Sequence, residues 1–414
     1  MQTGVISGLD VGTSRVTCVT AELSEEGALI VTGVGQASTG GGLREGSVID
    51  VKGVAGAVQA AIEEAEGVSS WSIDDVFVNV SGPHVRGIAG TGSVRIDRNE
   101  DYECREIDEE DIDRAEEAAR AVSFPATSRV LDVVVREYGV DSFDRLQKPP
   151  IGLRGEQLTA RVYTILADKT SVLNLEAAVG MAGRSVSGVF PSCLASAKAV
   201  LSHDELEMGV VLADIGAGTT DVAVFSNGTV CHVGVVPVGG DLISNDLRSL
   251  RIPSVQAEHL KREWAVASLT MVDPSKTVTV PKIGGRGSVS ISHSIISQVV
   301  TARVVEIFEA IAGEVGRSGM GVHDLPAGLV ITGGAASMPG MAEAGREVTG
   351  IPVEVGSPSV PDSVTDLVSK PAFATATGLL VLGLDYVANA GRRRRRPGIS
   401  DTLKRIGDVF RRMR

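Results

Sequence analysis

Apolar positions in the first eighty residues follow two periods, which predict strands followed by a helix. Runs of β-branched and apolar residues at 16–23, 29–36 and 76–80 predict strands. Between them, residues 51–66 place apolar side chains at steps of three and four, which predicts a helix that buries one stripe. The stripe consists of Val54, Val58, Ala61, Ile62 and Ala65. Strands that alternate with helices are typical of an α/β fold.

The pattern changes at residues 84–165, which we interpret as an inserted α+β unit. A hairpin is predicted at 85–96, a helix at 109–122, and strands at 129–138 and 158–167. The acidic run 97–117 is interpreted as a solvated helix face and its lead-in, not as a metal site.

Beyond the insert, strands and helices alternate again to the end of the apolar pattern. The apolar stretch 372–387 is predicted to be a buried helix, because Gly378, Gly383 and Asp385 interrupt it and it is too short to span a bilayer. The other predictions are helices at 169–181, 193–202, 241–251, 254–267 and 295–317, strands at 185–190 and 329–331, and a polar strand segment at 277–291.

One short motif occurs twice, at residues 6–14 (ISGLDVGTS) and 210–221 (VVLADIGAGTTD). Each copy is an apolar run that ends in Asp-x-Gly and continues into small hydroxyl residues and a second β-branched run. This predicts a β-hairpin whose glycine turn directs backbone N–H groups and hydroxyls at an anion. Two such hairpins, carrying Asp10 and Asp214, would hold a Mg²⁺-bound polyphosphate from opposite sides. We therefore expect two related halves with a nucleotide in the cleft between them.

Composition limits the class of protein. The 414 residues suggest two to three domains, and 49 glycines with 3% aromatic residues suit an α/β protein with many tight turns. The four cysteines (Cys18, Cys104, Cys193, Cys231) are scattered and are expected to be reduced thiols. Residues 392–414 contain ten Arg and Lys against two Asp, so this end is strongly basic while the rest of the chain carries a net charge of −21. An acidic body argues against nucleic-acid binding.

These motifs, together with a third at residues 329–340 (LVITGGAASMPG), resemble those of the actin-like ATPases. Within that superfamily the chain resembles the FtsA family of bacterial division proteins from end to end. The resemblance rests on residues 46–50 (GSVID), 78–82 (VNVSG), 214–221 with the following Gly-Gly pair, 257–261 (AEHLK) and the basic C-terminal segment. It implies a duplicated actin-like, ribonuclease H-like α/β fold with a central ATP cleft, an inserted α+β subdomain and a C-terminal amphipathic helix.

The resemblance also implies a division of the chain. The expected segments are 1–83, 166–204 and 369–390 (subdomain 1A), 84–165 (inserted subdomain 1C), 205–238 and 301–368 (subdomain 2A), 239–300 (subdomain 2B), 391–398 (basic linker) and 399–414 (membrane-targeting helix).

The expected ligands are ATP or ADP with Mg²⁺. Asp10 and Asp214 are expected to act on the metal through water. The expected nucleotide-binding residues are Asp10, Gly12, Thr13, Ser14, Arg15, Asp214, Gly216, Ala217, Gly218, Thr219, Thr220, Gly239, Gly240, Lys261, Gly333, Gly334, Ala335 and Ser337.

The chain departs from the family pattern at two places, of which the first crowds a phosphate slightly and the second concerns hydrolysis. Ala217 stands where the second phosphate motif usually has glycine, and Phe190-Pro191 stands where fast relatives place a Gln or Glu that positions the attacking water. We expect slow or undetectable ATPase activity. Asp214 and Asp221 are candidates for positioning water or metal, and no residue is assigned as catalytic.

The C-terminal segment 399–414 predicts an amphipathic helix. Its apolar stripe consists of Ile399, Leu403, Ile406, Phe410 and Met413, and the stripe is flanked by Lys404, Arg405, Arg411 and Arg412. A helix of this length needs a surface on which to pack, and anionic lipid offers one. Docking on the protein's own body and binding to nucleic acid are the alternatives.

The resemblance implies further partners and a location. Partners are the FtsZ C-terminal peptide, other copies of the chain in a filament, anionic membrane lipids and later division proteins. Basic residues suited to the FtsZ peptide are Lys282, Arg286 and Arg303. The expected function is to tether FtsZ filaments to the inner face of the cytoplasmic membrane at the division site. A PilM-type pilus-assembly scaffold and a sugar-kinase-like phosphotransferase are the alternatives, and for the latter we find no carboxylate base.

Overall fold

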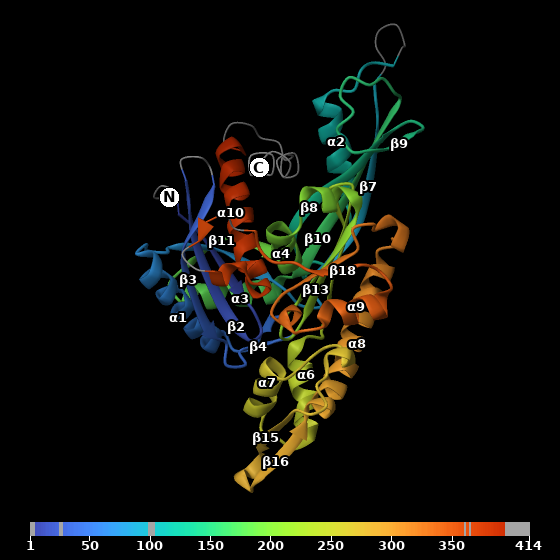
Figure 1. Cartoon of the computed structure of the whole chain (residues 1–414). Helices are drawn as coiled ribbons and strands as arrows, with labels where there is room; N and C mark the ends of the chain where they lie inside the picture. Colours follow the sequence, from blue (N-terminus) through green and yellow to red (C-terminus); the bar gives the residue numbers. More distant parts are fainter. Residues whose placement is uncertain (1–4, 25–27, 98–103, 360–361, 364–365, 394–414) are drawn as a thin grey trace.

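A computed structural model describes residues 5–24, 28–97, 104–359, 362–363 and 366–393. The chain forms two sheet-centred halves, an inserted unit at one end and a small hairpin at the other (Figure 1). The predicted α/β class is confirmed. The C-terminal segment predicted to target the membrane lies outside the described residues.

The first half is built on a six-stranded sheet of order β11-β6-β1-β2-β3-β19. Its strands are β1 (Val5–Val11), β2 (Arg15–Leu23), β3 (Leu29–Ser38), β6 (Asp75–Val80), β11 (Ser185–Pro191) and β19 (Asp362–Ser363). Its helices are α1 (Val51–Ser69), α3 (Lys169–Met181), α4 (Ser192–Val200) and α10 (Ala374–Arg393). A two-stranded ribbon of β4 (Leu43–Arg44) and β5 (Ser47–Val48) precedes α1.

The second half repeats this plan. Its five-stranded sheet has the order β14-β13-β12-β17-β18, and in each half a hairpin strand also pairs in parallel with a later strand: β1 with β6, and β12 with β17. The strands are β12 (Val210–Ile215), β13 (Thr220–Ser226), β14 (Thr229–Val236), β17 (Leu329–Thr332) and β18 (Val353–Val355). The helices are α5 (His203–Met208), α6 (Gly240–Leu247), α7 (Ser254–Glu263), α8 (His293–Arg317) and α9 (Met341–Thr349).

Helices cover both faces of the first sheet because its strands have no polar face. Leu9 and Cys18 pack with the α1 residue Ala61, whereas Val19, on the other face, packs with Ala376 of α10. The predicted stripe of α1 is fully buried, and Asp50 caps the helix by accepting hydrogen bonds from the second and third backbone N–H groups. Strand β1 therefore lies at the centre of a layered core and is fixed on both sides.

The inserted unit is a four-stranded antiparallel sheet, order β7-β10-β8-β9, covered by one helix. Its elements are β7 (Arg86–Arg95), α2 (Glu109–Arg120), β8 (Ser128–Val140), β9 (Phe143–Leu146) and β10 (Gln157–Asp168). The interpretation of the acidic run as a solvated face is wrong for two of its members. Asp111 and Glu116 point inward and are buried. The Asp111 carboxylate accepts hydrogen bonds from Arg105 and Arg114. The Glu116 carboxylate accepts hydrogen bonds from Arg120 and Tyr138.

The hairpin predicted at 85–96 is wrong, because these residues form the single strand β7, which pairs with β10. Three other predicted elements also differ from the structure. The segment 277–291 is a hairpin of β15 (Thr277–Pro281) and β16 (Ser288–Ser292), because Gly284, Gly285 and Gly287 adopt positive φ and turn the chain. Helix α7 ends four residues before its predicted end. The last helix begins as a 3₁₀ turn at Pro371–Phe373 and continues as α10 to Arg393.

Within the described residues, the segment Pro371–Ala388 is long and apolar enough to cross a membrane by length and composition, and half of it is buried in the protein. Helix α10 packs on α4 and β1, and a side chain at Gly378 would overlap Ala195 of α4. The prediction of a buried helix agrees with this packing.

Candidate functional site

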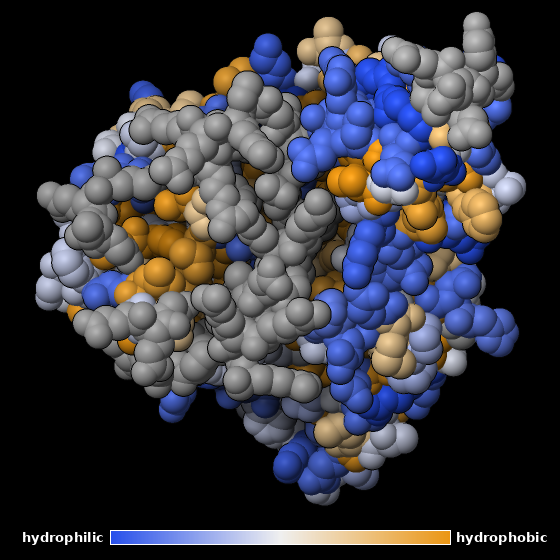
Figure 2. Space-filling model, turned by 90° about the horizontal axis from the view of Figure 1, so that it is seen from above, coloured by the Kyte–Doolittle hydropathy of each residue, from blue (hydrophilic) through white to orange (hydrophobic). Residues whose placement is uncertain are grey.

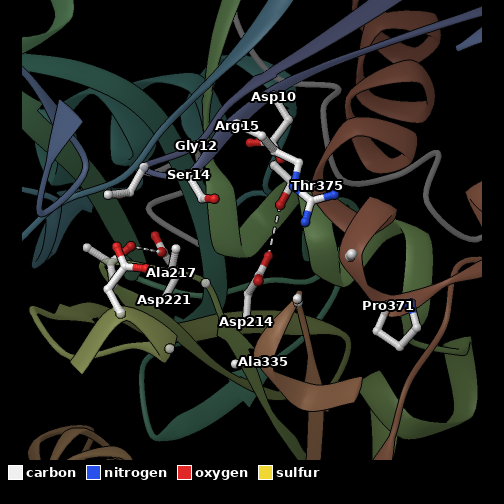
Figure 3. Close-up of a pocket in the computed structure, with 18 of the residues that line it drawn as sticks. Asp10, Gly12, Ser14, Arg15, Asp214, Ala217, Asp221, Ala335, Pro371 and Thr375 are labelled. Atoms are coloured by element: carbon white, nitrogen blue, oxygen red, sulfur yellow. Dashed lines mark hydrogen bonds between the residues drawn. The ribbon is translucent and has the colours of Figure 1, made fainter. Parts of the chain in front are cut away.

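The two copies of the duplicated motif form hairpins with the same turn. The backbone N–H of Gly12 donates to the carbonyl oxygen of Arg15 at 3.0 Å, and the N–H of Gly216 donates to that of Thr219 at 2.9 Å. Both turns line one cleft of about 270 Å³ between the halves (Figure 3). The predicted juxtaposition of the two motifs is therefore present in the fold.

Most of the predicted nucleotide-binding residues line this cleft, including all five of the first motif (Asp10, Gly12, Thr13, Ser14, Arg15). From the second half they are Asp214, Gly216, Ala217, Thr219, Gly240, Lys261, Gly333, Gly334, Ala335 and Ser337, and Asp221 joins them.

Three predicted residues are not among the lining residues. Thr220 is fully buried, and its hydroxyl donates to the carbonyl oxygen of Val238 at 2.8 Å. A Cβ on Gly218 would lie 2.7 Å from the hydroxyl of Thr13, and one on Gly239 would lie 2.6 Å from the carbonyl oxygen of Ala217. These residues shape the two turns and the start of α6, and stand behind the cleft surface.

Asp10 is held by a residue that sequence reasoning missed. The amide of Asn79, at the end of β6, donates to the Asp10 carboxylate at 2.8 Å and to the Ser192 hydroxyl at 3.0 Å. Its oxygen accepts the backbone N–H of Val11 at 2.7 Å. Asn79 thus fixes both the carboxylate and the strand that carries it. Burial and the charge of Asp214 raise the pKa of Asp10 to about 7.

Asp214 is oriented by hydroxyls from the first half. Ser196 of α4 and Thr375 of α10 both donate to the same carboxylate oxygen, Thr375 at 2.8 Å, and the two hydroxyls lie 2.9 Å apart. The other oxygen lies beside Gly333, whose φ is +89°. A side chain at position 333 would overlap this oxygen. Burial raises the pKa of Asp214, although the two hydroxyls oppose the change.

Asp221 is also reached from the first half. Ser81, which follows β6, donates to one Asp221 oxygen at 2.7 Å and lies 3.0 Å from the Thr219 hydroxyl. The remaining oxygen, Oδ1, is buried without a hydrogen-bond partner. Burial and the charge of Asp214 raise the pKa of Asp221 to about 8.

Three carboxylates therefore share one cleft, and each has a raised pKa. The repulsion between Asp10, Asp214 and Asp221 favours either a proton or a cation among them. In the part of the chain that the structure describes, no three His, Cys, Asp or Glu side chains are arranged to hold a metal ion.

The other end of the cleft lies between α6, α7 and the turn after β17. The Lys261 ammonium donates to the carbonyl oxygen of Gly240 at 3.1 Å and pairs with Glu258 at 2.7 Å. Arg262 pairs with the same carboxylate, so Lys261 is fixed in place against Gly240. Lining residues that the predicted site lacks are Val11, Gly46, Asn79, Ser81, Ser192, Asp241, Glu258, Arg262, Met338, Pro339, Pro371, Ala372 and Thr375.

Phe190 and Pro191 offer no polar side chain to the cleft. The Phe190 ring packs against Phe77 and Tyr386, with centroids 6.1 and 6.5 Å away. Pro191 precedes α4 and supplies no side-chain cap. The nearest polar group from this segment is the Ser192 hydroxyl, which donates to the carbonyl oxygen of Val80 at 3.1 Å.

The three basic residues predicted to bind a partner differ in their surroundings. Lys282 and Arg286 flank the exposed turn between β15 and β16. Arg303, on α8, pairs with Asp246 at 2.6 Å and with Glu306. A partner carboxylate at Arg303 would have to share or replace these contacts.

The fold and the paired hairpins define the chain as an actin-like protein. Two solved structures share the architecture. The PilM-PilN type IV pilus biogenesis complex has a TM-score of 0.63 and 18% identity, and the match covers 92% of this chain and 98% of the other. MreB5 of Spiroplasma citri bound to ADP has a TM-score of 0.54 and 13% identity, and the match covers 95% of this chain and 99% of the other.

Sequence comparison identifies the family. A model described as cell division protein FtsA matches residues 211–378, and one described as the SHS2 domain inserted in FtsA matches residues 82–166, close to the predicted insert. The cell division protein FtsA of Pseudomonas aeruginosa is 36% identical over 92% of this chain and 89% of its own length. The chain belongs to the FtsA family of cell division proteins.

Proposed function

We propose that the chain binds ATP or ADP with Mg²⁺ in the cleft and acts in cell division as a nucleotide-dependent adaptor between FtsZ filaments and the membrane. The observation that carries the nucleotide site is the pair of matched hairpin turns facing each other across three repelling carboxylates. In this proposal the turns at Gly12 and Gly216 hold the phosphates, and Asp10 and Asp214 act on hydrated Mg²⁺.

The fit of this group rests on two features. The unpartnered oxygen of Asp221 is buried and needs a donor or a hydrated cation. Gly333 and Gly334 keep side chains away from the carboxylates and from the Lys261 end, which leaves room for a sugar and a flat base. A bound Mg²⁺ neutralises phosphate charge. The chain's own contribution is to orient the carboxylates through Asn79, Ser81 and Thr375.

Calorimetric titration of the full chain with ATP, with and without Mg²⁺, tests the site. We expect binding that strengthens with Mg²⁺, and loss of that Mg²⁺ effect in Asp10→Asn, whose amide oxygen still accepts from Asn79. The exposed acid Asp113 on α2 supplies the matched control, Asp113→Asn. Absence of ATP binding in the presence of Mg²⁺ would refute the proposal.

Hydrolysis is proposed to be slow, because Phe190 and Pro191 position no water. Asp214 and Asp221 remain the candidates for positioning water or metal, and Asp221 has an unpartnered oxygen. A turnover above about 1 s⁻¹, the low end for typical enzymes, would contradict this.

We further propose that the FtsZ C-terminal peptide binds near the turn of β15 and β16. The exposed cations Lys282 and Arg286 suit the acidic start of such a peptide. In an anisotropy titration with a labelled FtsZ peptide, Lys282→Glu and Arg286→Glu should weaken binding. Lys276→Glu, on the same subdomain, should not. Equal loss in all three variants would contradict specific recognition.

Residues 399–414 are proposed to bind anionic lipid at the division site, with filament formation through copies of this chain and recruitment of later division proteins as further expectations. Each Lys or Arg near anionic lipid contributes about 1 kcal/mol. Deleting residues 392–414 should leave the protein in the supernatant of a sedimentation assay with vesicles of anionic lipid, while ATP and FtsZ peptide still bind. Sedimentation of the deleted form with vesicles would overturn the assignment.

A further inference from the structure

A second cavity, of about 520 Å³, lies where the inserted unit meets the first half. Strand β8, the edge strand β11, α4 and α10 supply most of its lining, and the second half adds Leu206, Phe225, Gly228 and Val230. Its apolar lining includes Val130, Val133, Val186, Leu194, Leu382 and Tyr386. Val130 and Tyr386 are 41% and 44% exposed, so the apolar lining is continuous with the surface. Seen from above, the molecule carries hydrophobic surface in recesses beside strongly hydrophilic surface (Figure 2).

The charges in this cavity favour a basic occupant. Two ion pairs lie in the wall, Arg129 with Glu176 at 2.7 Å and Lys198 with Asp385 at 3.1 Å. With Asp132, the lining has three carboxylates against two cations. An apolar cavity with carboxylates in its lining suits an apolar surface that is edged with arginine.

The chain itself carries such a surface at a suitable place. Helix α10 supplies three lining residues, Leu382, Asp385 and Tyr386, and ends at Arg393. The five residues 394–398 span up to about 17 Å when extended, and a 16-residue helix over 399–414 would be about 24 Å long. The apolar stripe therefore starts within reach of the cavity.

We propose that the amphipathic segment 399–414 docks its apolar stripe in the cavity between β8, β11, α4 and α10 when no membrane is present. Cavity and lipid then compete for the same five apolar side chains. This goes beyond the proposed function and depends on it only where lipid enters. If nine molecules in ten are docked, the apparent affinity for vesicles falls about tenfold.

The first experiment follows the cavity rim without lipid. An environment-sensitive fluorophore is attached to Ser187→Cys, a half-buried lining residue of β11, in a Cys104→Ser background, because the other three thiols are buried. Emission should be blue-shifted in the full chain relative to the form lacking residues 392–414, and anionic vesicles should remove the shift. Equal emission in the two forms overturns the proposal. A shift that depends on protein concentration also overturns it, because the docked segment would then belong to a second copy.

The second experiment weakens the cavity on its exposed side. Val130→Lys should raise apparent vesicle affinity about tenfold over Val255→Lys, which adds the same charge at a 77% exposed position on α7. Equal affinities overturn the proposal. Loss of vesicle binding in both variants and in the unmodified chain would instead count against the lipid function, and the rim fluorescence tests docking separately.

Discussion

Replacement of Asp221 by asparagine should stabilise the nucleotide-free protein at alkaline pH. The asparagine oxygen can still accept the hydrogen bond from Ser81. Its NH₂ group replaces Oδ1, the carboxylate oxygen that has no hydrogen-bond partner. Burial and neighbouring charge raise the pKa of Asp221 from 3.8 to about 8. The folded state therefore holds this proton more tightly than the unfolded state, and the associated stability, fully present below pH 3.8, is lost as the pH rises through 8.

The magnitude follows from that difference in pKa. At 1.36 kcal/mol per pH unit, the cost of the charged carboxylate above pH 8 is at most about 6 kcal/mol. The repulsion is shared among Asp221, Asp10 and Asp214, and it is only partly relieved when one of the three charges is removed. We therefore expect Asp221→Asn to raise the free energy of unfolding by about 2–4 kcal/mol. For a chain of this length that unfolds as one unit, the gain corresponds to roughly 2–5 °C in Tm.

Differential scanning fluorimetry from pH 5 to pH 8.5, without nucleotide or divalent cations, measures the effect. The difference in Tm between Asp221→Asn and the unmodified chain should be small at pH 5 and largest at pH 8.5. Asp113→Asn, at an exposed position, should show no such trend. A difference that stays constant with pH, or that favours the unmodified chain at pH 8.5, would refute the electrostatic account of the cleft.

Three further predictions concern the cleft and the insert. In urea unfolding, Gly333→Ala should lower the free energy of unfolding by at least about 2 kcal/mol more than Gly284→Ala does. Gly333→Ala should also abolish ATP binding. Both glycines have positive φ, but only the first would meet a carboxylate and backbone. Asn79→Ala should cost about 2–4 kcal/mol, because buried groups at Asp10 and β1 lose their partner, and a cost under 1 kcal/mol would contradict its role. Arg105 and Arg114 hold the pKa of Asp111 below its usual range, so this stability is present above pH 3.8 and is lost as the pH falls through the folded pKa. Asp111→Asn should accordingly be about 2–3 kcal/mol less stable at pH 7, and the difference should shrink in urea titrations toward pH 2.

The sequence predicted what local pattern determines. The α1 stripe and the two Asp-x-Gly hairpins depend on residues that are neighbours in the chain, so period and turn chemistry were sufficient. The supports of the cleft could not be found in this way. Asn79 meets Asp10, and Thr375 meets Asp214, only after distant segments pack together. No residue pattern near Thr375 marks it as part of the site.

Two errors had local causes. The glycines at 284, 285 and 287 mark a turn that a single polar strand cannot contain. In the acidic run, charge was equated with solvent contact. Asp111 is nevertheless buried, because arginines on and before the same helix neutralise it, which is the condition under which charged groups enter a core.

Helix α10 connects two remote places. Its first turn supplies the Thr375 hydroxyl to Asp214 in the cleft, and its last turn ends at Arg393, immediately before the C-terminal segment in the sequence. Because α10 packs tightly against α4 at Gly378, a tilt of α10 would have to carry α4 with it. Twenty residues of helix are about 30 Å long, so a tilt of about 5° at the first turn would displace the far end by roughly 2.6 Å. A small rearrangement around Asp214 would thereby be enlarged at Arg393, the residue before the C-terminal segment.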